Sequence, residues 1–118
     1  MISIALLDPH PGVHKGFKSF FKKANHITVV KMFTKSDDLF DFLNENDLDA
    51  LVLEMDLGGD STVRIIKKIK KEFPEIAMII FTALTQTIYG ISLLKAGAAG
   101  FLSKEIEGKV MIEAVEKV

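Results

Sequence analysis

The chain has 118 residues, 48% of them hydrophobic, and its formal net charge at pH 7 is only −1. This length suits a single domain with one core, and the composition argues against a disordered segment and against a generally basic nucleic-acid binder. Charged residues interrupt every apolar stretch before it reaches the roughly 18 residues of a membrane-spanning helix, so we expect no membrane partner. The sequence contains no cysteine, which excludes disulfides and thiolate chemistry and fits a cytoplasmic location.

Apolar runs of strand length alternate with amphipathic segments along the chain. The runs lie at Ile2–Leu7, Ile27–Phe33, Ala50–Leu53, Ala77–Phe81 and Gly100–Leu102. Each run is followed by a segment whose apolar residues recur at helical spacing. Five such alternations predict an α/β domain in which a five-stranded parallel sheet has helices on both faces.

Residues that favour helix ends mark the boundaries of the first three helical segments. Pro11 suits the first position of the first helix, and Thr34 is expected to cap the second. Asp60 or Ser61 is expected to cap the third helix, which Pro74 stops. The expected inward faces of these helices are Val13, Phe17, Phe20 and Phe21, then Leu39, Phe40 and Leu43, then Val63, Ile66 and Ile69.

Two further helices are expected toward the C-terminus. The segment Gln86–Ala96 has apolar residues at helical spacing, and Gly97 is placed to end this helix as its C-terminal cap. A last helix is indicated by the apolar residues Val110, Met111, Ala114, Val115 and Val118.

Polar side chains follow four of the predicted strands at the point where each strand ends. These residues are Asp8, Glu54, Thr82 and Lys104. The carboxyl ends of parallel strands meet at one edge of the sheet, where such folds bind ligands, so we expect the four side chains to lie close together. A site with two carboxylates, a hydroxyl and an ammonium group is therefore predicted at this edge.

Three stretches of the sequence resemble motifs of one known family. They are LLDPHPGVHKGF from Leu6 onward, FTA at Phe81–Ala83 and KAGAAGFLSKE at Lys95–Glu105. In this order and spacing they resemble the receiver domain of bacterial response regulators over essentially the whole chain, residues 1–118. The resemblance implies a flavodoxin-like, doubly wound fold with five helices and strand order 2-1-3-4-5.

The first motif is similar to the opening of receivers that precede a helix-turn-helix DNA-binding domain. The chain is therefore expected to be either a free-standing receiver or the N-terminal part of a longer regulator, and this similarity favours the second. Any contact with DNA is expected to be made by that C-terminal domain and not by the receiver.

The resemblance also implies a mechanism with roles for individual residues. In the family, a carboxylate at the third strand end, here Glu54, accepts a phosphoryl group from a histidine kinase with the help of a magnesium ion. Asp8 would belong to the acidic pair that holds the ion, and Thr82 and Lys104 would bind the phosphoryl oxygens. Phe101 would change rotamer as the threonine moves. Such catalysis consists of positioning and charge neutralisation.

The chain departs from the family pattern at two positions of this site. Glu54 stands where the family has its acceptor aspartate, and Pro9 stands where it has the second acidic residue. The extra methylene displaces the carboxylate oxygen by on the order of 1.5 Å, and about 1 Å of misplacement can cost roughly a hundredfold in rate. Proline supplies no carboxylate ligand, so conventional phosphorylation and magnesium binding are both expected to be impaired, and no cofactor is predicted.

Glu54 is instead expected to pair with Lys104 and to hold the receiver in one state, which either imitates the phosphorylated form or locks the inactive one. We therefore predict an atypical receiver that has no catalytic residues and signals by homodimerisation and protein contacts. The alternative is a working phosphoacceptor, with Glu54 or Asp56 phosphorylated by a sensor kinase. A small enzyme on this fold is disfavoured because no glycine-rich phosphate loop follows the first strand.

No metal site is expected from the sequence. Asp8, Glu54 and Asp56 are only weak candidate ligands. His10 and His14 lie four residues apart and close to Asp8, but no third ligand is spaced along the chain to close a coordination shell. The basic residues of the third helix are interpreted as a solvated face, and they are Arg64, Lys67, Lys68, Lys70 and Lys71.

Overall fold

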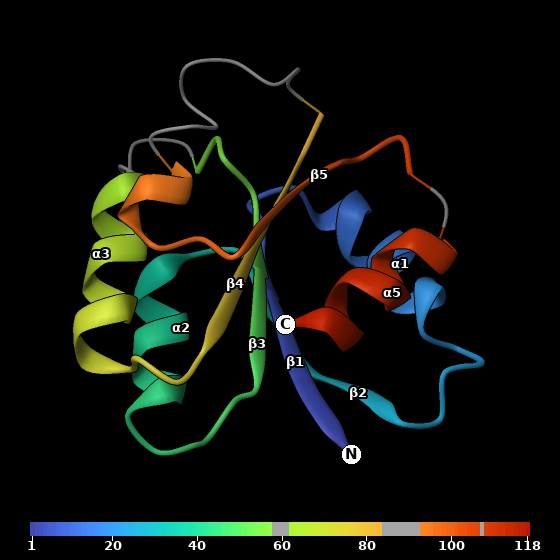
Figure 1. Ribbon diagram of the computed structural model, residues 1–118, viewed down its shortest axis with the longest axis horizontal. Helices are drawn as coiled ribbons and strands as arrows, with labels where there is room; N and C mark the ends of the chain where they lie inside the picture. Colours follow the sequence, from blue (N-terminus) through green and yellow to red (C-terminus); the bar gives the residue numbers. More distant parts are fainter. Residues whose placement is uncertain (58–61, 84–92, 107) are drawn as a thin grey trace.

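Five parallel strands form the centre of the structure (Figure 1). The structure is a computed structural model that describes residues 1–57, 62–83, 93–106 and 108–118. The strands are β1 (Ile2–Leu7), β2 (Ile27–Phe33), β3 (Ala50–Leu53), β4 (Ala77–Thr82) and β5 (Gly100–Ser103). Their order in the sheet is β2-β1-β3-β4-β5, which confirms the predicted doubly wound topology.

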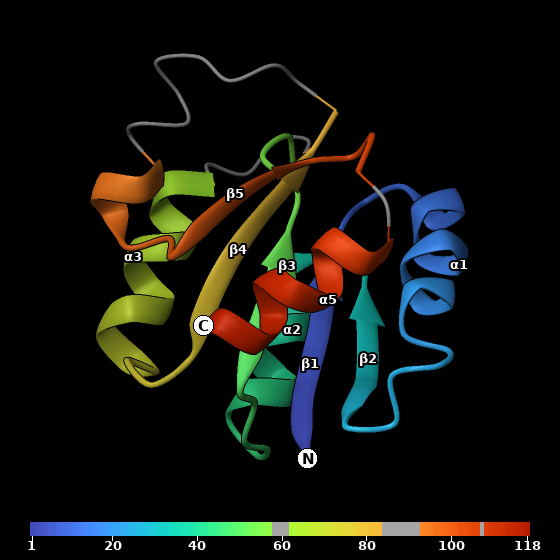
Figure 2. The ribbon, with the colours of Figure 1, turned by 45° about the vertical axis from the view of Figure 1, so that its right-hand side comes forward.

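Helices cover both faces of the sheet. The helices α1 (Pro11–Phe20) and α5 (Gly108–Lys117) lie on one face, and α2 (Ser36–Leu43) and α3 (Thr62–Glu72) lie on the other (Figure 1). Residues 93–96 are also helical, so five helical segments alternate with the strands, as predicted. In the turned view, β2 and β5 are the two edges of the sheet (Figure 2).

Alternate residues along each strand point to opposite faces and build two cores. The core on the α2 and α3 side includes Leu7, Leu53, Ile80, Leu39 and Ile66. The core on the α1 and α5 side includes Leu6, Val52, Phe81, Phe17 and Met111. Because both faces of the sheet are covered at its centre, the central strands β1, β3 and β4 read in the sequence as largely continuous apolar runs instead of alternating patterns.

The starts of α1 and α2 test two sequence predictions. The helix α1 begins at Pro11, as predicted. The prediction that Thr34 caps the second helix is wrong, because α2 has Lys35 at its N-cap position and no side-chain capping hydrogen bond. Thr34 lies one residue too early to reach the first helical N–H groups. Asp37 and Asp38 in the first turn place negative charge near the positive end of the helix dipole instead.

The end of the fourth predicted helix is formed by a C-terminal cap at Gly97. The N–H of Gly97 donates to the carbonyl of Leu94 at 3.1 Å, and the N–H of Ala98 donates to the carbonyl of Leu93 at 3.1 Å. This pair of bonds is the Schellman arrangement, which requires a positive φ at the first residue after the helix. Gly97 has a φ of +131°, so its predicted role is confirmed.

Two predictions concern residues outside the described part of the chain. They are the capping of α3 by Asp60 or Ser61 and the course of the helix Gln86–Ala96 before residue 93. The helix α3 ends at Glu72, two residues before Pro74, as predicted. Among the described residues, no helix has the length and apolar character needed to cross a membrane.

Candidate functional site

The ends of β1 and β3 bring two carboxylates together. These strands are paired with Leu7 opposite Leu53, and the N–H of Glu54 donates to the carbonyl of Leu7 at 3.0 Å. Asp8 and Glu54 are therefore the first residues after two adjacent strands. Asp8 is 0% exposed and Glu54 is 4% exposed. Ionised groups buried to this extent need charged or hydrogen-bonding partners.

Lys104 is the charged partner of both carboxylates. It follows β5, and its backbone N–H donates to the carbonyl of Thr82 at the end of β4, at 2.9 Å. The Lys104 ammonium donates to Oδ2 of Asp8 at 2.8 Å and to Oε1 of Glu54 at 2.6 Å. The expected pair of Glu54 with Lys104 is present, and the bond to Asp8 was not expected. We call Asp8, Glu54 and Lys104 the ion cluster.

The second oxygen of each carboxylate also has partners. Oε2 of Glu54 accepts hydrogen bonds from the backbone N–H groups of Met55 at 2.6 Å and Asp56 at 3.2 Å. Oδ1 of Asp8 accepts a hydrogen bond from the backbone N–H of His10 at 2.8 Å and lies 2.7 Å from Nδ1 of the same residue. All four carboxylate oxygens are thus held in place by neighbouring donors.

Burial and charge act in opposite directions on the pKa of Lys104. Burial disfavours the ammonium and by itself would lower the pKa. The hydrogen bonds and negative charges of Asp8 and Glu54 outweigh burial, so the pKa is raised above its ordinary value of 10.5. Lys104 is therefore an ammonium at neutral pH and acts as the internal cation of the ion cluster.

The other predicted site residues differ in their distance from the ion cluster. Thr82 is fully buried at the end of β4 and adjoins it through the backbone bond to Lys104. Phe101 is partly buried against the core on the α2 and α3 side. The side chain of Asp56 is exposed, and its backbone N–H is the group that contacts Glu54.

Sequence reasoning missed the contact of His10 with Asp8. The bond from the His10 N–H to the Asp8 side chain closes an Asx-turn, a local pattern in which an aspartate bonds the backbone two residues later. That known tendency of aspartate was the available signal. His14 approaches the same strand end differently, because its Nε2 lies 2.8 Å from the backbone carbonyl oxygen of Asp8.

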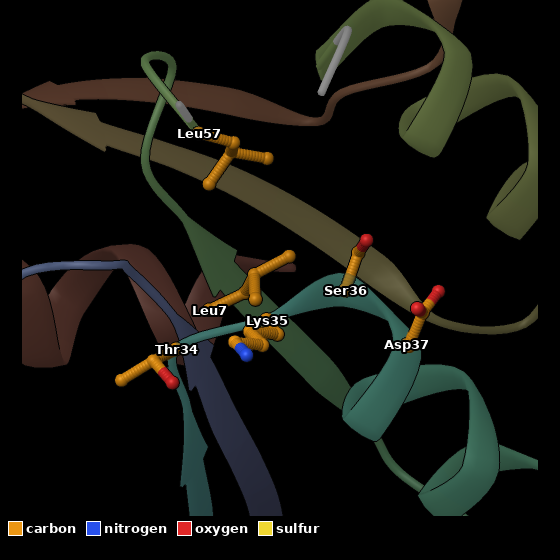
Figure 3. A pocket seen from close by; sticks show the side chains of 6 residues that line it. All are labelled: Leu7, Thr34, Lys35, Ser36, Asp37 and Leu57. Atoms are coloured by element: carbon orange, nitrogen blue, oxygen red, sulfur yellow. The ribbon is translucent and has the colours of Figure 1, made fainter. Parts of the chain in front are cut away.

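A small hollow lies near the end of β1, on the α2 side of the sheet (Figure 3). It has a volume of about 170 Å³, and its walls come from the end of β1, the start of α2 and the loop after β3. The lining residues are Leu7, Thr34, Lys35, Ser36, Asp37 and Leu57. Within the described ranges, no member of the ion cluster lines this hollow.

Comparison with protein families identifies the kind of domain that contains this site. Residues 4–116 match the response regulator receiver domain family. The chain belongs to this family. The receiver is 25% identical to the response regulator UvrY of Escherichia coli K12 over 118 residues, which are 100% of this chain and 54% of that protein. It is 26% identical to the transcriptional activator protein ExaE of Pseudomonas putida, over 99% of this chain and 55% of that protein.

Solved structures of receivers have the same fold as this one. A LuxR-family two-component response regulator from Aurantimonas sp. SI85-9A1 superposes with a TM-score of 0.88 at 22% identity, over 98% of this receiver and 82% of that chain. The isolated receiver domain of RcsB from Salmonella enterica serovar Typhimurium, with the phosphomimetic BeF3-, gives a TM-score of 0.87 at 23% identity, over 98% and 86%. The receiver itself spans about half the length of the curated relatives that it matches.

Proposed function

We propose that this receiver transmits signals through protein contacts without conventional aspartyl phosphorylation. The observation that supports this proposal is the double contact of the Lys104 ammonium with Asp8 and Glu54, at 2.8 and 2.6 Å. In the family, the lysine at this position binds a phosphoryl group on the acceptor. Here the carboxylate of Glu54 takes that place, so the lysine is neutralised before any phosphoryl group arrives.

We further propose that the site binds magnesium poorly. Magnesium requires near-octahedral oxygen ligation and usually takes one or two protein carboxylates. Pro9 offers no side-chain oxygen, and an oxygen of each remaining carboxylate is hydrogen-bonded to an ammonium group. The Lys104 ammonium, which already bonds to both carboxylates, competes with any ion that would bind between them.

The relatives support a proposal for the role of the whole protein. Response regulator UvrY and transcriptional activator ExaE are about twice as long as this chain. We propose that the receiver, residues 1–118, is the N-terminal part of a cytoplasmic transcriptional regulator that binds DNA through a separate C-terminal domain. Its partners would be a second copy of itself and a sensor kinase that acts through contact. No enzymatic activity is proposed for it.

An intact-mass measurement tests this function. The chain is incubated with magnesium and acetyl phosphate, and we expect no adduct of about 80 Da, the mass of one phosphoryl group. As a matched control, the double variant Pro9→Asp, Glu54→Asp restores the acidic pair and the acceptor length, and we expect it to be phosphorylated. A wild-type adduct that disappears in Glu54→Gln or in Asp56→Asn would instead establish a working acceptor at that residue.

A further inference from the structure

A groove of about 550 Å³ lies at one edge of the sheet, between β2 and α2. We call it the β2 groove, and its lining includes residues 31–34, Asp38, Asp41 and Glu45. In the part of the chain that the structure describes, β1 is the only neighbour of β2 in the sheet (Figure 2). We propose that an extended segment of a partner protein, with alternating basic and apolar side chains, binds in this groove as an added strand. This inference is independent of phosphorylation and does not rest on the proposed function.

The lining of the groove follows the edge of β2. Residues 31–34 all belong to the lining, although successive side chains of a strand point to opposite faces, so the groove runs along the edge of the strand. The carbonyl of Phe33 accepts a hydrogen bond from the N–H of Asp8 at 2.9 Å, on the β1 side. Successive residues direct their backbone groups to opposite edges, so the N–H and carbonyl of Met32 point to the open edge. An extended segment can form hydrogen bonds with both groups.

A bulge restricts how much of this edge can pair. The register between β1 and β2 shifts between Ile4 and Ala5, so that Val30 is skipped. A bulge of this kind twists the edge and interrupts regular pairing. The regular part of the open edge therefore begins at Lys31, where the groove also begins. The edge is suited to a short segment of a partner and not to a long strand of another sheet.

The two sides of the groove differ in chemistry. The side formed by α2 and the residues after it carries the carboxylates of Asp38, Asp41 and Glu45. On the α1 side the groove is lined by His14 and Met32, and Met32 packs against the core on that side of the sheet. The side chains of an added strand alternate between these two sides. Its side chains on the α2 side should therefore be basic, and those on the α1 side should be apolar.

The charge of the groove selects a basic partner. With His14 neutral, the charged lining residues are three carboxylates and the ammonium of Lys31, which leaves an excess of two negative charges. None of the ion pairs between described residues involves these three carboxylates. A second copy that docked through the same groove across a twofold axis would bring two negative surfaces together. A basic segment neutralises the groove instead.

Binding of a fluorescein-labelled peptide of about six residues, in which lysine and valine alternate, tests the site. Fluorescence anisotropy with the purified chain measures the affinity, and we expect the amide NMR signal of Met32 to shift. A peptide with the lysines and valines in separate blocks should bind at least about fivefold more weakly, because it cannot place basic and apolar side chains on opposite sides. Methylation of the backbone nitrogens keeps the charge of the alternating peptide but removes its N–H donors, and this should also weaken binding by at least about fivefold.

Two double variants separate the β2 groove from a general attraction to cations. Asp41→Asn with Glu45→Gln should weaken binding of the alternating peptide by at least about threefold. Both positions lie at the C-terminal end of α2, where negative charge does not favour the helix, so folding should be retained, and an unchanged thermal unfolding midpoint verifies this. Glu72→Gln with Glu75→Gln makes the same change in charge at exposed positions elsewhere and should leave the affinity unchanged.

Several results would overturn the site. Absence of binding at millimolar peptide, or equal affinity of the two double variants, would show that the groove does not hold a basic segment. Undiminished binding of the methylated peptide would exclude an added strand, and equal binding of the blocked peptide would show attraction to charge alone. A shift between monomer and dimer in Asp41→Asn with Glu45→Gln, measured by sedimentation without peptide, would show that a second copy occupies the groove instead.

Discussion

At the scale of single residues, the ion cluster joins one ammonium group to two buried carboxylates. Lys104 has 15% of its side chain exposed, and its two carboxylate partners are almost completely buried. Replacing a buried ion pair by apolar groups can be neutral, but removing one member leaves an uncompensated charge and costs roughly 3–5 kcal/mol. The cluster therefore resists opening even if it adds little net stability.

The first prediction concerns Lys104→Met and pH. The variant leaves Asp8 and Glu54 without their cation, so we expect the free energy of unfolding to fall by about 3 kcal/mol near neutral pH. The pKa of Lys104 is raised in the folded state, so its stabilising contribution is fully present below pH 10.5 and is lost as pH rises through the folded pKa.

Urea denaturation of both proteins at several pH values measures this contribution. The difference between wild type and Lys104→Met should stay constant up to about pH 10 and shrink above pH 10.5. Lys67→Met, at an exposed position of α3, is the control and should change stability by less than about 0.5 kcal/mol. If Lys104→Met also lowered the free energy of unfolding by less than about 0.5 kcal/mol, the structural importance of the ion cluster would be contradicted.

At the scale of elements, the strands position the site, and the turn at Gly97 leads the chain into β5. Gly97 ends the helical residues 93–96, just before β5, with a positive φ. An added Cβ at this position would lie 3.3 Å from Cγ and Cδ of Lys70 on α3. The direction in which the chain enters β5, and so the place of Lys104, depends on this turn.

Gly97→Ala should therefore destabilise the receiver by more than about 1 kcal/mol, because alanine is strained at positive φ. The matched control is Gly16→Ala, at an exposed helical position where a Cβ meets nothing within 4 Å. That variant should be unchanged or up to about 1 kcal/mol more stable. Thermal or urea unfolding of both variants decides the matter, and equal effects would contradict the role assigned to the Gly97 turn.

Much of this architecture could be predicted from local patterns. The central strands β1, β3 and β4 are apolar because both of their faces are covered, and Gly97 is recognisable because few other residues adopt its backbone geometry. Thr34 was assigned wrongly, since a cap depends on where the chain turns into the helix, and several nearby residues could start it. Each strand-end residue is predictable separately, because it directly follows an apolar run.

The contacts among those residues were harder to predict. Asp8 and Lys104 are 96 positions apart, and only the distance between their side chains reveals that one ammonium serves two carboxylates. The place of His10 depends on a local turn at Asp8. Pairing across a sheet is set by packing and register. A sequence pattern can therefore place such residues at one edge of the sheet, but it does not show which side chains contact each other.

At the scale of the whole molecule, the ion cluster lies at the carboxyl edge of the sheet, and helices cover both faces of the sheet. In the proposed function, self-association does not require a phosphoryl group. Sedimentation of the chain should therefore be the same with and without magnesium and acetyl phosphate. Lys104→Met, which opens the ion cluster, should shift the distribution between monomer and dimer. A wild-type profile that responds to the phosphoryl donor would contradict this expectation.

A double-mutant cycle between Lys104 and Glu54 tests most directly whether the ion cluster holds this receiver in one state. The free energy of unfolding is measured for wild type, Lys104→Met, Glu54→Gln and the double variant. We predict a coupling energy of about 2 kcal/mol, within the range found for residues in one buried network. A control cycle uses His26 and Glu116, a surface pair whose side chains are 51% and 45% exposed, and its coupling should not exceed about 1 kcal/mol. Additivity of Lys104→Met and Glu54→Gln within about 0.5 kcal/mol would contradict the central claim.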